Sequence, residues 1–151
     1  MATPSLPPIG LVLAQTAKGC GRAFEDALAQ AGGTTPTWLI LTALIQGGHR
    51  TQADLAATVN VQGPTLTHHL NGMEKEGLIV RSRLPDNRRA HQVALTDAGR
   101  AAFHRLREAA IAHDARVRAG FTPAELQTLR ELLLRLGRNV PDTRSEPAES
   151  A

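Results

Sequence analysis

The hydrophobic period of the chain changes at Gly77, and this change limits the fold more than any other feature of the sequence. Before it, apolar residues recur at the three- and four-residue spacing of one helix face, namely Leu66, Leu70 and Met73. After it, Leu78–Arg83 and His91–Leu95 read as strands, and the residues between them have the composition of a turn. The pattern predicts a helix that is followed directly by a β-hairpin.

A shorter helix is predicted immediately before this unit. Thr51 stands three residues before Asp54, which is the spacing of a capping box, where each side chain bonds the backbone N–H of the other residue. Asn60 tolerates the left-handed conformation that a tight turn requires. Pro64 falls in the first turn of the next helix, where its missing N–H costs nothing. The sequence therefore predicts a helix, a tight turn and a second helix ahead of the hairpin.

The side of the second helix that faces away from the apolar stripe is polar and short. At roughly 100° per residue, Thr65, Thr67 and His68 lie on this side, which is nearly free of acid. Such a face suits a phosphate-lined groove of DNA. His68 is expected to contact a base edge or a phosphate, and the alternative is a solvated histidine. His69 lies nearer the flank, where a structural or phosphate-facing role is expected.

Positive charge gathers on the hairpin. The net charge of the whole chain is only +3, but the segment from Arg81 to Arg89 holds four arginines and one acid. Arg88 and Arg89 stand at a tip too short to bury anything, and arginine suits phosphates and narrow minor grooves. A solvated charge pair is the alternative. The predicted DNA-contacting residues are Gln62, Pro64, Thr65, Thr67, His68, His69, Arg81, Arg88 and Arg89.

The order and spacing of these pieces resemble the winged helix-turn-helix regulators of the MarR (multiple antibiotic resistance regulator) family. The resemblance rests on Gly-Leu-Ile-Val-Arg at 77–81, Pro-Asp-Asn-Arg-Arg at 85–89 and Val-Ala-Leu-Thr-Asp-Ala-Gly at 93–99, and it covers nearly all of the chain except the last dozen residues. It implies a mainly α fold with a small β-hairpin, the wing, and a transcriptional regulator that binds double-stranded DNA. The family usually has Asp where this chain has Asn87, so the ion pair that steadies the wing is expected to shift to Asp86.

The length of 151 residues fits one domain. Residues 1–8 are expected to form a flexible lead, 9–139 a single domain, and 140–151 a disordered tail rich in Pro, Ser and Glu. The winged helix-turn-helix core should occupy about 36–96, with long helices at about 9–31 and 96–138. Within this scheme Thr35 is predicted to cap a largely buried helix that begins at Pro36.

A core of about 60 residues does not need long amphipathic helices at both ends. The resemblance implies that the first helix and the last two form the dimerisation region of a homodimer by interleaving with a second copy. Its two heads would then meet successive major grooves of an inverted repeat. The alternative is that the leucine stripe packs within one chain. This stripe consists of Leu126, Leu129, Leu132, Leu133 and Leu136.

The resemblance also implies a repressor that a small aromatic or phenolic ligand releases from DNA. Arg22, Trp38 and His49 are the candidate ligand-binding residues, although a tryptophan is more often plain core. Cys20 raises the alternative of a thiol-based redox sensor. Cysteine sensors in the resembled group hold the thiolate with tyrosines, and this chain has no tyrosine. A small buried thiol is therefore the favoured interpretation.

Other functional classes find little support in the sequence. No G-x-S-x-G, H-E-x-x-H or G-x-x-x-x-G-K motif occurs, so neither an enzyme nor a cofactor is predicted. The histidines lack the spacing of metal ligands, because His104 and His113 fall on opposite helix faces. The single cysteine and the lack of a long apolar run predict a cytoplasmic protein without a membrane span. A winged helix used only for protein interaction remains the alternative, but it would gain nothing from the tip arginines.

Overall fold

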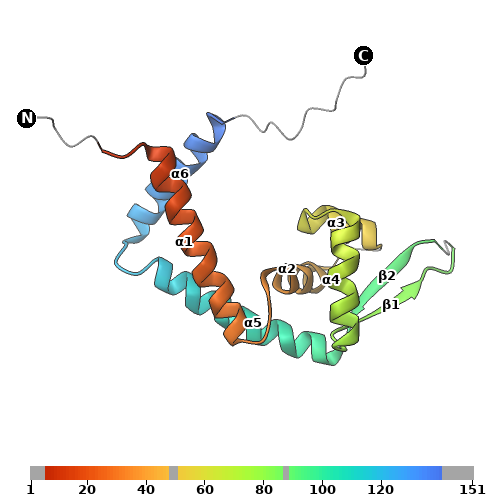
Figure 1. Ribbon diagram of the computed structural model, residues 1–151. Helices are drawn as coiled ribbons and strands as arrows, with labels where there is room; N and C mark the ends of the chain where they lie inside the picture. Colours follow the sequence, from red (N-terminus) through yellow and green to blue (C-terminus); the bar gives the residue numbers. More distant parts are fainter. Residues whose placement is uncertain (1–5, 48–50, 87–88, 141–151) are drawn as a thin grey trace, which may run out of the picture. The chain divides into compact units, whose positions relative to one another are not determined.

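The computed structural model describes residues 6–47, 51–86 and 89–140. Within these ranges the chain forms six helices and one antiparallel two-stranded sheet (Figure 1). The helices are α1 (Ile9–Gln30), α2 (Thr35–Gln46), α3 (Gln52–Val59), α4 (Gly63–Lys75), α5 (Asp97–Val117) and α6 (Pro123–Arg138), and the strands are β1 (Ile79–Arg83) and β2 (His91–Leu95). The predicted mainly α fold with one hairpin is confirmed. The chain divides after Asp114 into two compact units, each with its own internal contacts.

The helix-turn-helix forms by the local interactions that the sequence predicts. The Asp54 backbone N–H donates to Thr51 Oγ1 at 3.1 Å, and the Thr51 N–H donates to Asp54 Oδ2 at 3.0 Å, which completes the capping box of α3. Asn60 ends α3 in the left-handed conformation, with φ 54° and ψ 48°. Pro64 lies in the first turn of α4, as expected.

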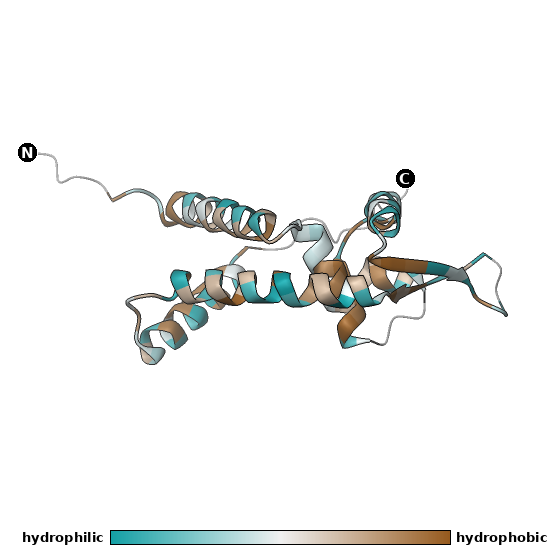
Figure 2. Cartoon of the chain, turned by 90° about the horizontal axis from the view of Figure 1, so that it is seen from below, coloured by the Kyte–Doolittle hydropathy of each residue, from teal (hydrophilic) through white to brown (hydrophobic). Residues whose placement is uncertain are grey.

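The wing is the β1–β2 hairpin. Its register pairs Ile79 with Leu95 at the base and Arg83 with His91 farther out. Along the hairpin the colour in Figure 2 changes from hydrophobic brown at the base to hydrophilic teal farther out. In the described part of the wing, Ile79 and Val93 are buried in the core, and the residues farther out are exposed or half-buried.

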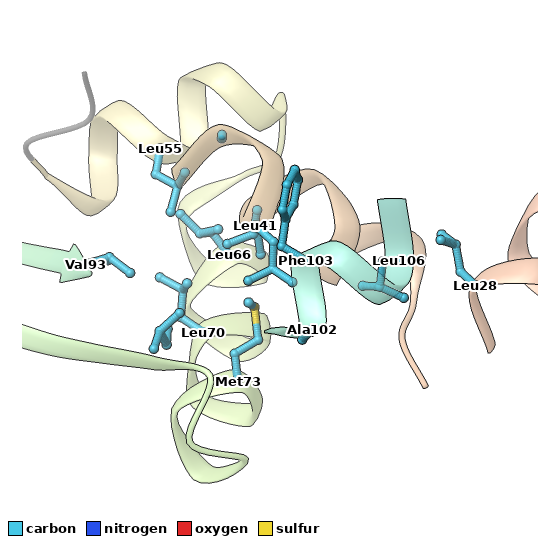
Figure 3. Packing of buried hydrophobic residues seen from close by; sticks show 13 residues of the cluster. Leu28, Leu41, Leu55, Leu66, Leu70, Met73, Val93, Ala102, Phe103 and Leu106 are labelled. Atoms are coloured by element: carbon cyan, nitrogen blue, oxygen red, sulfur yellow. The ribbon is translucent and has the colours of Figure 1, made fainter. Parts of the chain in front are cut away.

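One apolar core holds the first unit together (Figure 3). The apolar stripe predicted for α4 is buried in it, since Leu66 and Leu70 are 0% exposed and Met73 is 3% exposed. Leu55 of α3 and Leu106 of α5 are equally inaccessible. The core thus fixes α4 between α3 and the other elements and leaves the opposite side of α4 to solvent.

The start of α2 differs by one residue from the prediction. The helix is capped by Thr34, whose Oγ1 accepts a hydrogen bond from the Thr37 backbone N–H at 3.3 Å. Thr35 is the first helical residue, and its buried Oγ1 has no hydrogen-bond partner among the described residues. Two adjacent threonines can both cap a helix, and tertiary packing decides between them. The packing here involves Gly33, the residue before the cap, which lies so close to α5 that an added Cβ would be 2.6 Å from Leu106 Cδ2.

Thr96 joins the wing to α5. Its hydroxyl donates to the Gly77 carbonyl at 2.6 Å and accepts from the Gly99 N–H at 3.0 Å. Its backbone N–H donates to the Leu78 carbonyl at 3.1 Å. Gly99 is buried, and a methyl group there would overlap the Leu78 carbonyl oxygen and lie 3.1 Å from Leu95 Cδ2. The first turn of α5 can therefore lie against the wing only because residue 99 has no side chain.

The second unit contains α6. A capping box between Thr122 and Glu125 starts this helix, with Pro123 in its first turn. No residue of α6 is buried, although the helix carries the predicted leucine stripe. Leu129, Leu132 and Leu133 are between 42% and 48% exposed. None of the helices in the described ranges is both long enough and apolar enough to cross a membrane.

Candidate nucleic-acid interface

The exposed side of α4 carries most of the residues predicted to face DNA. Gln62, Pro64, Thr65 and His68 are all exposed. Gln62 is the N-cap, and its side chain makes no capping hydrogen bond. His69 is half-buried and lines, with Thr35 of α2, a small cavity of about 70 Å³. Four of the predicted residues therefore lie on one accessible surface at the start of α4, and their contact with DNA stays a prediction.

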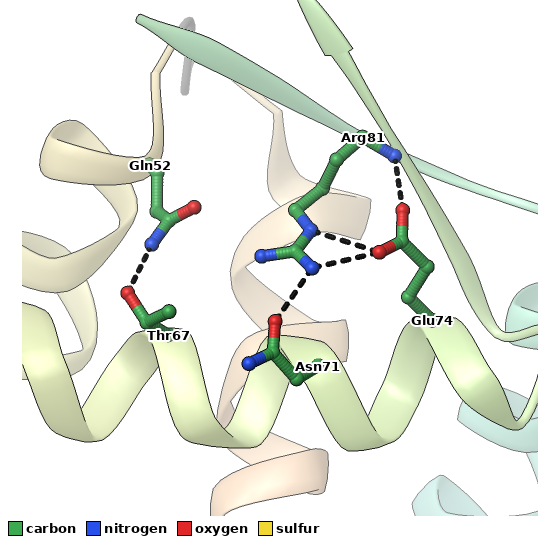
Figure 4. A network of polar contacts seen from close by, with 5 residues as sticks. All are labelled: Gln52, Thr67, Asn71, Glu74 and Arg81. Atoms are coloured by element: carbon green, nitrogen blue, oxygen red, sulfur yellow. Dashed lines mark hydrogen bonds and ion pairs between the residues drawn. The ribbon is translucent and has the colours of Figure 1, made fainter.

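Thr67 is held by neighbouring groups within the protein. Its Oγ1 accepts a hydrogen bond from Gln52 Nε2 at 2.6 Å and donates to the Gly63 carbonyl at 3.0 Å (Figure 4). The side chain is half-buried because it lies about 100° from Leu66 around the helix, on the flank against which α3 packs. Gln52 and Thr67 thus tie the two helices of the helix-turn-helix together.

Arg81 is held against α4 by two side chains of that helix. Its Nη2 lies 2.7 Å from Glu74 Oε2 and 2.6 Å from Asn71 Oδ1 (Figure 4). Its Nε also donates to Glu74 Oε2 at 3.2 Å, and its backbone N–H donates to Glu74 Oε1 at 3.1 Å. Glu74 therefore fixes both the backbone and the side chain of Arg81, and this network fixes β1 of the wing against α4.

The electrostatics of Glu74 agree with this geometry. Its pKa lies below the usual value for a glutamate because the Arg81 guanidinium and backbone N–H bond to the carboxylate, and because the Arg81 and His91 charges favour the ionised form. The carboxylate is accordingly charged at neutral pH, and the ion pair is complete there.

Replacement of Glu74 by glutamine tests the wing contact. The amide keeps one acceptor and loses the charge, so we expect DNA binding to weaken by less than about tenfold. A lowered pKa in the folded state means that the wild-type ion pair stabilises above the ordinary glutamate range and that this stabilisation is lost as the pH falls through the lowered pKa. When urea unfolding is measured from neutral to acidic pH, the difference in the free energy of unfolding between the wild type and Glu74→Gln should therefore shrink. A constant difference across that range would contradict this role.

The outer part of the wing faces a groove beside α3 and α4. Asn87 and Arg88 lie outside the described residues, so the predicted position of Arg88 at the tip stays an expectation. Arg89 is exposed and lines the groove, which has a volume of about 540 Å³. Among the residues that line it are Thr51, Gln52, Gly63, Thr67, Arg89 and His91.

The candidate ligand and redox residues lie elsewhere. Trp38 belongs to the edge of the core, where its ring stacks on Phe103 with centroids 5.6 Å apart. Arg22 is exposed on α1, Cys20 is half-buried on the same helix, and His49 lies outside the described residues. Across the described ranges, no group of three or more His, Cys, Asp or Glu side chains could hold a metal ion.

Three residues of the polar network, Gln52, Asn71 and Glu74, were missing from the sequence prediction. Gln52 and Asn71 are separated from their partners by 15 and 10 positions, so no local pattern reports these contacts. A helical wheel could have indicated Asn71, because it falls three residues after His68 on the exposed side of α4.

Residues 34–91 match the MarR family. A putative transcriptional regulatory protein for the hcr operon of Thauera aromatica is 30% identical over 123 residues, which cover 81% of this chain and 74% of that protein. These findings connect the helix-turn-helix and wing with transcriptional regulators.

Solved structures agree. The crystal structure of a probable transcriptional regulator from Pseudomonas aeruginosa is 31% identical, with a TM-score of 0.73 over 86% of this chain and 97% of that one. The transcriptional repressor CouR, solved bound to a 23-mer DNA duplex, is 27% identical, with a TM-score of 0.76 over 87% of this chain and 93% of that one. Both are regulators with the same arrangement of elements.

Proposed function

Because this chain belongs to the MarR family of transcriptional regulators, we propose that it acts as a homodimeric repressor on an inverted-repeat operator. In this proposal α4 is the recognition helix in the major groove, and the wing reaches the adjacent minor groove. The observation that supports it most strongly is the exposed start of α4 beside an arginine-bearing hairpin that Glu74 fixes in place. The 27% identical repressor CouR was solved with a DNA duplex, which supports the same mode here.

The second copy is proposed because the described chain leaves apolar surface without cover. A 16-residue helix such as α6 with no buried residue gains little stability from its own hydrogen bonds, and amphipathic helices depend on packing. The start of α1 is apolar and exposed as well, at Ile9, Leu11, Val12 and Leu13. Since symmetric pairs are the commonest assemblies, a second copy of the chain is the partner that we propose for these helices.

Selection of bound fragments from sheared genomic DNA of the source organism tests the proposal. The enriched fragments should share an inverted repeat whose half-sites are centred about 10 base pairs, or a multiple of that, apart. The neighbouring genes would then identify what is regulated. Enrichment without any shared motif would contradict sequence-specific regulation.

Replacement of Arg89 by alanine should weaken operator binding by about 5- to 150-fold, since a groove-inserted arginine contributes about 1–3 kcal/mol. If the side chain neutralises a phosphate, the dependence of affinity on salt should also become less steep by about one charge. Gel mobility shift assays over a series of salt concentrations measure both the affinity and its salt dependence. Arg105, exposed on α5, supplies the matched control, and R105A should bind as the wild type does. Equal losses in both variants would contradict a specific role for the wing.

The proposal includes release from DNA by a small aromatic or phenolic ligand. Such a ligand must bind better to a dimer whose heads are wrongly spaced, because equal affinity for both states would shift nothing. Arg22 and Trp38 remain the candidate contacts among the described residues. Trp38 is half-buried against Phe103, so a ligand that reached it would also disturb the contact between α2 and α5.

A further inference from the structure

We propose that Asn71 determines operator specificity, and that the wing sets whether the oxygen or the NH₂ group of its side-chain amide faces the DNA. This inference rests on the proposed function of α4 as the recognition helix. In it, Arg81 holds the amide oxygen of Asn71, and the amide NH₂ group is left to select a hydrogen-bond acceptor on a base edge.

The orientation of the Asn71 amide follows from the chemistry of its partner. The Asn71 side-chain atom next to Arg81 Nη2, at 2.6 Å, is assigned as Oδ1. A guanidinium group has donors and no acceptor, so only the amide oxygen can bond to it. The reversed amide would place two donors against each other. Nδ2 therefore points away from Arg81, and the direction of the amide is fixed.

Arg81 is itself fixed, so it can impose this orientation. Glu74 accepts hydrogen bonds from the Nε, Nη2 and backbone N–H of Arg81, at distances between 2.7 and 3.2 Å. The Arg81 side chain is only 19% exposed. Asn71, by contrast, is exposed, and it lies on the side of α4 that also carries His68 and Gly72.

Gly72 allows a partner to come close beside Asn71. A Cβ at position 72 would meet no atom of the chain within 4 Å, so internal packing does not require the glycine. Within a helix it costs about 1 kcal/mol relative to alanine. A close approach of DNA to the helix backbone at this point explains why the position has no side chain.

The free NH₂ group predicts a base preference. An asparagine whose amide oxygen and NH₂ group are both free recognises adenine, because the oxygen accepts from N6 while the NH₂ group donates to N7. Here Arg81 holds the amide oxygen turned toward the wing, so the oxygen and Nδ2 cannot face one base together. This paired contact is therefore lost, and the NH₂ group presents only donors. Guanine offers two adjacent acceptors in the major groove, O6 and N7, whereas cytosine offers the N4 donor. Asn71 should therefore favour guanine and reject cytosine at one position of each half-site.

Selection from randomised half-sites by the full-length wild-type and variant proteins tests this assignment. Asn71→Asp keeps an acceptor for Arg81 and turns a second acceptor toward the DNA, so the preference should change from guanine to cytosine or adenine at a single position, by about tenfold. Asn71→Ala should lose the preference at that position and keep it elsewhere. Asn139→Asp, an exposed site at the end of α6, adds the same charge and should leave the selected motif unchanged. Because Asn71 is exposed, equal melting temperatures are expected and should be checked first.

The outcomes separate this inference from the proposed function. If the wild type selects a clear motif and both Asn71 variants select the same one, the inference is wrong and the regulator remains. A uniform loss of affinity for all sequences would place the amide on a phosphate and would also overturn it. If the wild type selects no motif, the proposed function fails and the inference fails with it.

Discussion

Replacement of Gly99 by alanine is expected to lower the free energy of unfolding by about 3 kcal/mol or more, since an inserted methyl group in a site that cannot relax carries a cost of this order. The added group would overlap the Leu78 carbonyl oxygen, which accepts the hydrogen bond of the Thr96 N–H, and would also crowd Leu95. The overlap is with backbone, so no side-chain rotation relieves it. The start of α5 must move away from the wing, and the Thr96 contacts must break. Urea unfolding followed by circular dichroism measures the loss.

Gly72→Ala is the matched control for this experiment. It makes the same change within a helix, at a position where the added Cβ meets nothing. We expect it to raise stability by up to about 1 kcal/mol through helix propensity alone. If the two alanine variants were equally stable, the close contact of α5 with the base of the wing would not exist as described.

In the proposed homodimer, the double replacement of Leu129 and Leu133 by glutamate should separate the two subunits. Leu129 and Leu133 are each 42% exposed, so a second copy can bury about two fifths of each side chain, and the four leucines of a symmetric pair would together contribute about 2.5–5 kcal/mol. Their loss corresponds to about a 10²- to 10³-fold rise in the dissociation constant. Sedimentation equilibrium measures this change. Operator binding should fall with it, because a lone head reads only one half-site.

The double replacement should leave the helical structure of α6 intact. Leucine and glutamate have similar helix propensities, so the helix should still form once its neighbours allow it. Arg135→Glu alters the net charge of the chain by the same amount on the polar side of α6 and should remain dimeric. A double variant that stays dimeric would mean that the leucine stripe packs within its own chain.

Local interactions made much of the helix-turn-helix and the wing predictable from the sequence. The capping box at Thr51, the left-handed turn at Asn60 and the proline at position 64 each involve neighbours in sequence, so their residue types alone indicated where α3 begins and ends and where α4 begins. The change of period at Gly77 located the wing for the same reason. The predicted starts of β1 and of α2 each differ by one residue from the structure, since adjacent residues of similar propensity are separated only by tertiary packing.

Tertiary contacts explain what the sequence could not provide. Thr67 and Arg81 were predicted from their residue types to face DNA, but the type of a side chain does not identify its partner. Arg81 bonds to Glu74, and Thr67 bonds to Gln52. These hydrogen bonds join different secondary-structure elements, so they depend on how packing in the core positions α4. For the same reason, the role proposed for Asn71 became evident only from the fold.

The stacking of Trp38 on Phe103 gives the molecule a natural optical probe. Trp38 is the only tryptophan of a chain that has no tyrosine, and the two rings lie 5.6 Å apart with their planes within 6° of each other. Ultraviolet emission therefore arises from one site, where α2 meets α5. Melting of that contact should shift the emission spectrum, whereas separation of subunits that leaves it intact should not. A single fluorescence measurement could thus distinguish unfolding of the α2–α5 contact from dissociation of the proposed dimer.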